Sequence, residues 1–396
     1  MQPETLPDGW TWVRFGDVVK QYTNHEREPE AAGIERVVSL GDLDPLSLRI
    51  TRWSDVAEGT SFTKSFQPGH VLFGKRRVYQ KKAALADFAG LCSGDIIVME
   101  AKPKRLLPDL LPFIVQSDAF FDYAEKHSAG GLSPRTKWSS LAKFEMPLPP
   151  MDRQRELVEV FRGVENVLIR HEEAIDSIAE LRRSLAQKIA TSEEFERAPL
   201  SKLARLQVGY AYKSSWFVGE GEGVRLMRGE NVGYGQADWS NTKCLDPELA
   251  PEYEEYQLED GDIIIGMDRS FTASGFKVTD IAARDLPSLL VQRVGRFQLA
   301  DGHRDYLRAI LDSPYYQRVL RRNEQGTDIP HLSKTDILGP DVPIPPYEEQ
   351  IKLGGKHAEV RSAEAALRKN LRSVERVKRS LLTEMLAPSE QLAEAA

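Results

Sequence analysis

The segment MPLPPMDRQRELVEVF, residues 146–161, returns later in the chain as VPIPPYEEQIKLGGKH, residues 342–357. In both copies a pair of prolines precedes a long run of charged and apolar residues. A residue before proline is biased towards extended backbone, and proline itself is well tolerated in the first turn of a helix. Acidic residues follow the prolines, where the helix dipole favours them. Each copy therefore predicts an extended lead-in that opens into a helix.

The two copies belong to a longer internal repeat. Aligning Pro147 with Pro343 gives an offset of 343 − 147 = 196 residues, and identical residues recur at this offset over a long window. The segments that match without a gap are about 109–191 and 305–387. The segments before them, about 1–108 and 200–304, are much less alike. The chain is therefore predicted to alternate variable and constant regions, each present twice.

Each constant segment ends in a long helical pattern. Apolar residues recur at alternating spacings of three and four across 157–189 and 353–385, which is typical of a coiled-coil seam. Two matching stripes are most simply buried against each other, and a two-fold relation between the repeats makes this pair antiparallel. His171 lies in the seam, and a polar pair with Glu364 that fixes the register is one hypothesis. At a rise of about 1.5 Å per residue, ~40 residues form a rod roughly 60 Å long.

Both variable segments contain apolar, strand-like runs such as DIIVME at 95–100 and DIIIGM at 262–267, and both lead into helical stretches at 109–126 and 305–322. We therefore predict a mixed α/β fold with a pseudo-two-fold internal repeat, in which two α/β domains are separated by a long antiparallel two-helix coiled coil. The predicted divisions are domain 1 at 1–150, spacer helix 1 at 151–191, a linker at 192–199, domain 2 at 200–346, spacer helix 2 at 347–387 and a flexible tail at 388–396.

The composition supports this organisation. The chain has 396 residues, 29% charged and 41% hydrophobic, which suits two domains of a soluble globular protein. No apolar run approaches the roughly 20 residues that span a bilayer, and the first residues show no signal segment, so we expect a cytoplasmic protein. The two cysteines, Cys92 and Cys244, predict neither a disulfide framework nor a metal site.

Basic residues gather on predicted loops of both variable domains, although the net charge is −7. Phosphate binding depends on local patches rather than on total charge, so the total argues only against a nonspecific coating role. Arginine and lysine recognise phosphates and guanine, and asparagine recognises adenine. The alternative is that each cluster is a solvated surface without a ligand. The DNA-binding candidates are Lys75, Arg76, Arg77, Tyr79, Lys81, Lys82, Arg135, Lys137, Tyr212, Lys213, Arg228, Asn231, Arg269, Arg293, His331 and Lys334.

Several motifs together resemble those of one known family. They are LPDGWTWVRFGDVV at 6–19, GYAYKSSWF at 209–217, the two proline hinges, each followed by a glutamine, and the helix ends LRRSLAQKI and VKRSLLTEML. In these motifs, and over nearly its whole length, the sequence resembles the specificity subunits of type I restriction–modification systems.

The resemblance implies a phage-defence function that the periodicity does not show. Each variable region would be a target-recognition domain that reads one half of a bipartite site in double-stranded DNA. The long helices would set the spacing of the half-sites and dock two modification subunits, which methylate adenine using S-adenosylmethionine. Restriction subunits, the motor-nucleases, would join with ATP and Mg²⁺. The specificity subunit itself would be non-catalytic, with no cofactor of its own.

Two short motifs suggest catalysis, and we discount both. IPPY at 344–347 resembles the Asn/Asp-Pro-Pro-Tyr loop of adenine methyltransferases, but an isoleucine side chain cannot hold the exocyclic amine. Glu100 and Lys102, with Asp87 upstream, have the spacing of a nuclease site that binds a hard cation, yet the second repeat lacks this set. The seven histidines show no ligand spacing, so no metal is predicted. A self-contained nuclease or methyltransferase, and a coiled-coil adaptor without DNA contact, stay open as alternatives.

Overall fold

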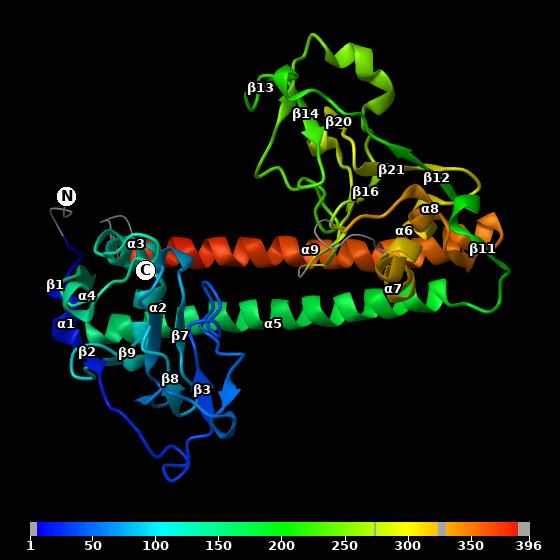
Figure 1. The fold of residues 1–396 in the computed structure, drawn as a ribbon. Coiled ribbons are helices and arrows are strands. Elements are labelled where there is room, and N and C mark those ends of the chain that lie inside the picture. Colours follow the sequence, from blue (N-terminus) through cyan, green and yellow to red (C-terminus); the bar gives the residue numbers. More distant parts are fainter. Residues whose placement is uncertain (1–5, 273–274, 324–329, 387–396) are drawn as a thin grey trace. The chain divides into compact units, whose positions relative to one another are not determined.

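The computed structural model describes residues 6–272, 275–323 and 330–386, so the predicted tail at 388–396 lies outside the described residues. The chain divides into two compact units, which we call unit 1 (1–172 with 369–396) and unit 2 (173–368). Both units combine sheets with helices, which confirms the predicted mixed α/β class (Figure 1). Among the described residues, no helix is long and apolar enough to cross a membrane.

Unit 1 contains two four-stranded sheets. The first has the order β2-β9-β6-β7 and is antiparallel throughout. Its strands are β2 (Val19–Tyr22), β9 (Ile96–Ala101), β6 (Val71–Gly74) and β7 (Ala83–Leu85). The second has the order β4-β3-β8-β5, with β3 and β8 parallel. Its strands are β4 (Ser54–Asp55), β3 (Arg36–Val38), β8 (Gly90–Cys92) and β5 (Lys64–Phe66). β9 reads as a nearly unbroken apolar run because both of its faces are covered.

The core of unit 1 joins the first sheet to helices α2 (Leu111–Gln116) and α3 (Asp118–Lys126). The same core includes Val158 and Phe161 from the start of α5 (Met151–Ala190). It also includes Leu382 and Met385 from the end of α9 (Tyr347–Leu386). Within unit 1 the two long helices are therefore paired with opposite chain directions.

Unit 2 repeats this plan. Its first sheet has the order β12-β21-β16-β19 and is also antiparallel, and its second has the order β13-β15-β14-β20 with β14 and β20 parallel. The strands of the first sheet are β12 (Ala204–Val208), β21 (Val294–Leu299), β16 (Ile263–Gly266) and β19 (Val278–Asp280). Those of the second are β13 (Phe217–Val218), β15 (Cys244–Leu245), β14 (Val224–Met227) and β20 (Ser288–Leu290).

The core of unit 2 contains α6 (Arg304–Asp312), α7 (Pro314–Asn323) and α8 (Lys334–Leu338). Ile189 from the end of α5 is buried there, and Leu353 from the start of α9 packs against it. A short pairing of β11 (Arg197–Pro199) with β22 (Asp341–Pro343) matches that of β1 (Thr11–Arg14) with β10 (Glu145–Leu148) in unit 1.

The stretches predicted as single helices at 109–126 and 305–322 are each broken at one serine. Ser117 and Ser313 have extended backbone, with ψ of 147° and 137°. The Ser117 hydroxyl accepts a hydrogen bond from Phe120 N at 3.2 Å, and Ser313 does the same from Tyr316 N at 3.1 Å. Serine is a favoured N-cap because its oxygen satisfies an otherwise unpaired amide of the first turn.

One glutamine holds the hinge that opens each long helix. Gln154 Nε2 donates to Pro149 O at 2.9 Å, and its Oε1 accepts from Leu107 N at 2.9 Å. Gln350 makes the same two bonds, at 3.0 Å to a hinge proline and at 2.8 Å from His303 N. Both side chains are almost fully buried. The repeated glutamine therefore ties the start of each helix to the α/β part of its own unit.

Candidate nucleic-acid interface

The structure brings two basic segments of unit 1 together. One follows β6 and begins at Lys75, and the other follows α3 and contains Arg135. Lys75 O accepts from Thr136 N at 2.9 Å, and Arg77 N donates to Pro134 O at 2.9 Å. Because these bonds join backbone to backbone, they can form with many different side chains on the two loops.

Asp95 neutralises two of the predicted candidates in unit 1. Its carboxylate lies 3.5 Å from Arg76 Nη1 and 3.1 Å from Arg135 Nε, and Arg76 Nε also donates to Ser133 Oγ at 2.7 Å. Burial alone would raise the pKa of Asp95, but its contacts with Arg135 and Arg76 outweigh burial and lower that pKa. Arg76 and Arg135 are thus part of what holds the two loops together.

The other candidates of unit 1 divide into engaged and exposed side chains. Lys81 Nζ lies 2.5 Å from Asp118 Oδ1, and Lys82 Nζ donates to Leu40 O at 3.0 Å. Arg77, Tyr79 and Lys137 are exposed, and Lys75 is half-buried. The exposed three are the side chains that a ligand could reach without breaking an ion pair recorded among the described residues.

Unit 2 has the same pair of loops. Met267 O accepts from Leu332 N at 2.9 Å, and Arg269 N donates to Pro330 O at 2.7 Å. Arg269 and His331 therefore lie together, and Lys334 is exposed at the start of the adjacent α8. The positions correspond one to one with those of unit 1.

The acidic and basic residues at these equivalent positions are exchanged between the two units. Lys75 N donates to Asp95 O, and Met267 N donates to Arg293 O, both at 2.9 Å, so Asp95 and Arg293 are equivalent. Isolated bridges pair Arg76 with Arg135 and Asp268 with His331. In unit 2 the acid is Asp268, and Arg293 Nη1 lies 3.6 Å from its Oδ1. The same backbone thus carries opposite charges in the two units.

The repeat offset of the constant segments did not reveal this correspondence because the variable segments differ in loop length. A sequence signal does exist: both first loops directly follow an apolar strand that ends in glycine, at Gly74 and Gly266. A Cβ on Gly74 would lie 2.7 Å from Leu40 Cδ1 and 3.2 Å from Lys82 O, so the chain enters the loop at a closely packed point.

The remaining candidates of unit 2 belong to other segments of the chain. Asn231 is buried, and its amide nitrogen donates to Asp238 O at 2.9 Å and to Asn241 O at 3.2 Å. Arg228 pairs with Glu230 at 2.5 Å and also donates to Asn241 O at 2.7 Å. These contacts hold a turn together.

Tyr212 is buried in a cluster of aromatic rings, with centroid distances of 5.1 Å to Tyr210 and 5.0 Å to Tyr253. Lys213 lies over Trp216 at 5.1 Å. Tyr212 and Lys213 therefore belong to an aromatic cluster.

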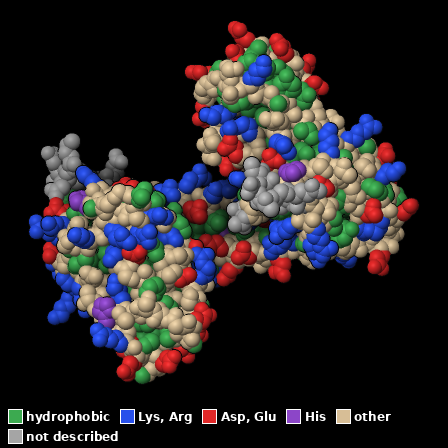
Figure 2. Space-filling model, viewed as in Figure 1, with side chains coloured by type: hydrophobic (Ala, Val, Ile, Leu, Met, Phe, Trp, Pro, Cys, Tyr) green, Lys and Arg blue, Asp and Glu red, His purple; other side chains and the backbone are tan. Residues whose placement is uncertain are grey.

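Lysine and arginine side chains are interspersed with acidic ones over both units, and no face seen in Figure 2 is uniformly basic. This mixture of charges on the visible face fits the net charge of −7.

The residues that suggested catalysis are engaged elsewhere. Glu100 Oε2 lies 3.0 Å from Lys20 Nζ, and Lys102 Nζ donates to Gly16 O at 2.7 Å. The described part of the chain contains no group of three His, Cys, Asp or Glu residues that could hold a metal ion. Ile344 of the IPPY motif packs against the core of unit 2.

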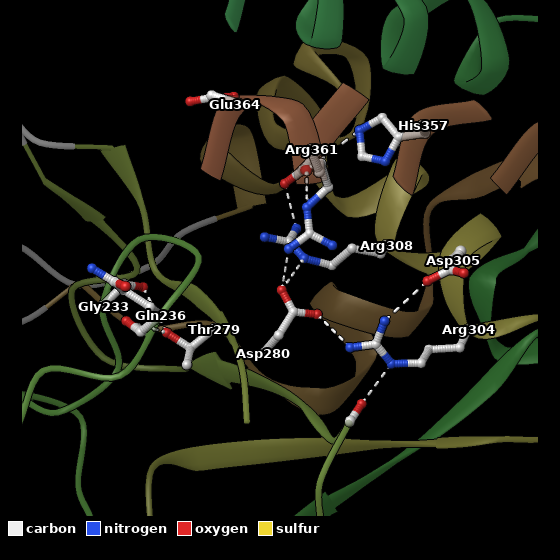
Figure 3. A network of polar contacts seen from close by, with 12 residues as sticks. Gly233, Gln236, Thr279, Asp280, Arg304, Asp305, Arg308, His357, Arg361 and Glu364 are labelled. Carbon is white, nitrogen blue, oxygen red and sulfur yellow. Dashed lines mark hydrogen bonds and ion pairs between the residues drawn. The ribbon is translucent and has the colours of Figure 1, made fainter. Parts of the chain in front are cut away.

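A buried network of charges in unit 2 was not foreseen from the sequence (Figure 3). Asp280, at the end of β19, accepts from Arg304 Nη2 at 2.8 Å and from Arg308 Nε at 3.0 Å, and Arg361 of α9 contacts the same carboxylate. Burial acts to raise the pKa of Asp280, but the surrounding arginines, Arg308 first, lower it overall. The network joins the sheet of unit 2 to α6 and α9.

The predicted seam pair of His171 with Glu364 is replaced by other contacts. Glu364 Oε2 accepts from Arg182 Nε of α5 at 2.8 Å, and Oε1 accepts from Arg368 Nη2 at 2.9 Å. His171 Nδ1 lies 2.8 Å from Val167 O of its own helix. A polar residue of the seam does bridge the two helices, but its partner is an arginine.

No family model matches the chain. Its sequence is 22% identical over 419 residues to the specificity subunit of the type I restriction enzyme MjaVIII from Methanocaldococcus jannaschii, covering 96% of this chain and 93% of that subunit. The crystal structure of a type I restriction–modification S subunit from M. genitalium covers 98% of this chain and 100% of its own, with a TM-score of 0.60 at 15% identity.

A chain from a structural study of the assembly and conformational transition of the type I restriction–modification system covers 98% of this chain and 100% of its own, with a TM-score of 0.56 at 19% identity. At such identities the structural likeness shows the fold. The sequence relative and these folds confirm the resemblance indicated by the motifs: over nearly its whole length, this chain is similar to the specificity subunits of type I restriction enzymes.

Proposed function

We propose that the chain is the sequence-specific DNA-recognition subunit of a type I restriction–modification complex. The observation that carries this proposal is the pair of backbone-clamped loops that occurs once in each unit with different side chains. Two loops of one shape and different chemistry suit a protein that reads two unlike half-sites. Side chains on such loops contact base edges and phosphates, while the sheets hold them in place.

In this proposal the long helices set the distance between the half-sites. Each helix has 40 residues, and each contributes to the core of both units. At about 1.5 Å per residue such a helix is roughly 60 Å long, which accommodates half-sites one turn of B-DNA apart, ~34 Å. The continuous coiled-coil seam and the domain boundaries predicted from the sequence are part of this proposal.

The chain acts here without catalysing a reaction. Methylation of adenine with S-adenosylmethionine, and cleavage with ATP and Mg²⁺, are assigned to two modification subunits and to restriction subunits. Because the proposed complex acts on cellular DNA, we expect it in the cytoplasm. Glu100 and Lys102 support this assignment, because each is already engaged by another group.

Methylome sequencing of the native host, with and without the gene for this chain, tests the proposal. We expect one bipartite methylated motif to disappear on deletion and to return on complementation. Insertion of one heptad into both long helices should change only the gap between the two halves. An unchanged methylome would contradict the proposal.

A self-contained nuclease makes a different prediction. Purified chain with Mg²⁺ alone would then cleave DNA, and Glu100→Ala would abolish that cleavage. This result would replace the proposed function, whereas partner binding without sequence-dependent DNA affinity would favour the adaptor alternative.

A further inference from the structure

Among the described residues, four basic ones have left-handed backbone. Their φ values are 53° for Arg77, 50° for Lys81, 47° for Arg269 and 65° for Arg293. Residues other than glycine, asparagine and aspartate rarely adopt this backbone conformation, because their Cβ atom comes too close to the following carbonyl oxygen. Such strain persists only where surrounding contacts hold it, and it is concentrated at functional sites.

Two of these four residues have an acidic partner and two do not. Lys81 pairs with Asp118, and Arg293 lies against Asp268. Arg77 and Arg269 are exposed, and across residues 6–272, 275–323 and 330–386 neither guanidinium has a recorded hydrogen bond or ion pair. A strained backbone at a residue whose side chain has no partner inside the protein indicates that the side chain is positioned to bind another molecule.

Arg77 and Arg269 are also equivalent in position. Each is the third residue after a strand that ends in glycine, β6 in one unit and β16 in the other. Each donates its backbone N–H to a proline carbonyl of the second loop, Pro134 at 2.9 Å and Pro330 at 2.7 Å. The neighbouring charges are exchanged between the units, yet arginine with positive φ occupies this one position in both.

We propose that Arg77 and Arg269 are the matched base-reading residues of the two units, and that each binds the O6 and N7 atoms of one guanine in the major groove. The guanidinium is a planar fork that fits this pair of acceptors, and its direction must be fixed for both bonds to form. A phosphate contact needs no such fixed direction. The exposed lysines Lys137 and Lys334, which follow Pro134 and Pro330 of the second loops closely in sequence, could supply it. This inference rests on the proposed function.

Glycine substitution tests the inference without disturbing the loops, because glycine adopts positive φ at no steric cost. In the native host, Arg77→Gly should relax the methylated motif at one G·C pair of one half-site and leave the other half-site unchanged. Arg269→Gly should relax one G·C pair of the other half-site. Leu46→Gly is the matched control, since Leu46 has a φ of 59° and carries no charge, and the motif should not change.

A second measurement separates base reading from phosphate binding. The complex purified from the host is titrated with duplexes that carry 7-deazaguanine, which lacks the N7 acceptor, at the relaxed position. Wild-type affinity should fall roughly tenfold, and the affinity of the Arg77→Gly complex should not fall further.

If Arg77→Gly instead weakens binding to all sequences equally and reduces the salt slope by about one, the residue contacts phosphate and the inference is wrong. An unchanged motif in both glycine variants would also overturn it. Loss of the proposed function is a distinct result, because then no motif depends on the chain at all.

Discussion

The α/β part of each unit packs against the long helices, and the residues that make this contact differ between the two units. In unit 1, Phe161 of α5 stacks on Phe113 of α2 with ring centroids 4.8 Å apart, and both are buried. The repeat places His357 of α9 where unit 1 has Phe161. His357 is fully buried, and its Nε2 lies 3.4 Å from Asp312 Oδ2. The position that holds a pair of stacked rings in unit 1 therefore holds a buried histidine beside a carboxylate in unit 2.

The polar contacts beside these residues differ in the same way. In unit 1, Lys378 Nζ donates to Gln116 Oε1 at 2.7 Å and also pairs with Glu165. The repeat matches Lys378 with Arg182 and Gln116 with Asp312. Arg182 contacts Asp312 at 3.0 Å. In unit 1 the ammonium group of Lys378 contacts one amide and one carboxylate, whereas in unit 2 Arg182 contacts a carboxylate that two further arginines also face. Unit 2 therefore depends on a larger buried network of charges than unit 1 does.

The largest effect is expected from Asp312→Ala. Arg308, Arg182 and Arg361 all face this carboxylate, and their charges lower its pKa against the effect of burial, which alone would raise it. Removing one partner of a buried ion pair leaves uncompensated charge and costs about 3–5 kcal/mol. Hydrogen–deuterium exchange should show α6 opening more readily by that amount. A loss below about 1 kcal/mol would mean that the network contributes little to unit 2.

A smaller effect is expected from acid at His357 in unit 2. Burial is the main cause that lowers the pKa of His357 to about 4, although the charge of Asp312 acts in the opposite direction. The unfolded chain therefore binds a proton at this histidine below about pH 6.5, whereas the folded chain does not until about pH 4. As the pH falls through this window, unit 2 should lose about 3 kcal/mol, measured by exchange at α6 and α9.

The repeat itself supplies the control for this prediction. His357→Phe gives unit 2 the phenylalanine that unit 1 has at the equivalent position, Phe161. The position equivalent to Phe113 is the smaller Ala309, which leaves room for the new ring. Unit 2 of the variant should lack the loss that His357 causes between pH 6.5 and pH 4.5, while exchange in unit 1 should be the same in both proteins at each pH. An equal acid response in wild type and variant would assign the titration to another group. Below about pH 4, Asp280 and Asp312 add a further loss, because their lowered pKa values mean that protonation opposes folding.

The smallest effect is expected from Gln116→Ala in unit 1. The change removes the hydrogen bonds to Lys378 Nζ and to Ala83 O, at 2.7 and 3.3 Å, but Glu165 still neutralises the ammonium. Loss of one partner of a buried hydrogen bond costs about 1–3 kcal/mol. Exchange at α2 should therefore change less than exchange at α6 does in Asp312→Ala. A larger change at α2 would show that unit 1 depends on this polar contact as much as unit 2 depends on its own.

Much of the fold follows from local sequence. The proline pairs and the spacing of three and four predict that a long helix follows each hinge, as α5 and α9 do. That the ends of these helices are buried in the cores of both units was not predicted. The break at Ser117 was missed because a capping serine inside an apolar pattern reads like an ordinary helical residue. The equivalence of Arg77 and Arg269 was missed because the variable segments differ in loop length, although a strand ending in glycine precedes both residues.

The sequence by itself determined the two-fold repeat, the long helices and the mixed α/β class, because periodicity and turn chemistry act over a few neighbouring residues. Tertiary structure alone decided which charged side chains are paired with an opposite charge. Asp95 engages Arg76 and Arg135 but not Arg77, and Asp312 lies among arginines from three helices. Ion-pair partners this far apart in the chain are brought together by the packing of sheets and helices. A local sequence pattern therefore does not predict them.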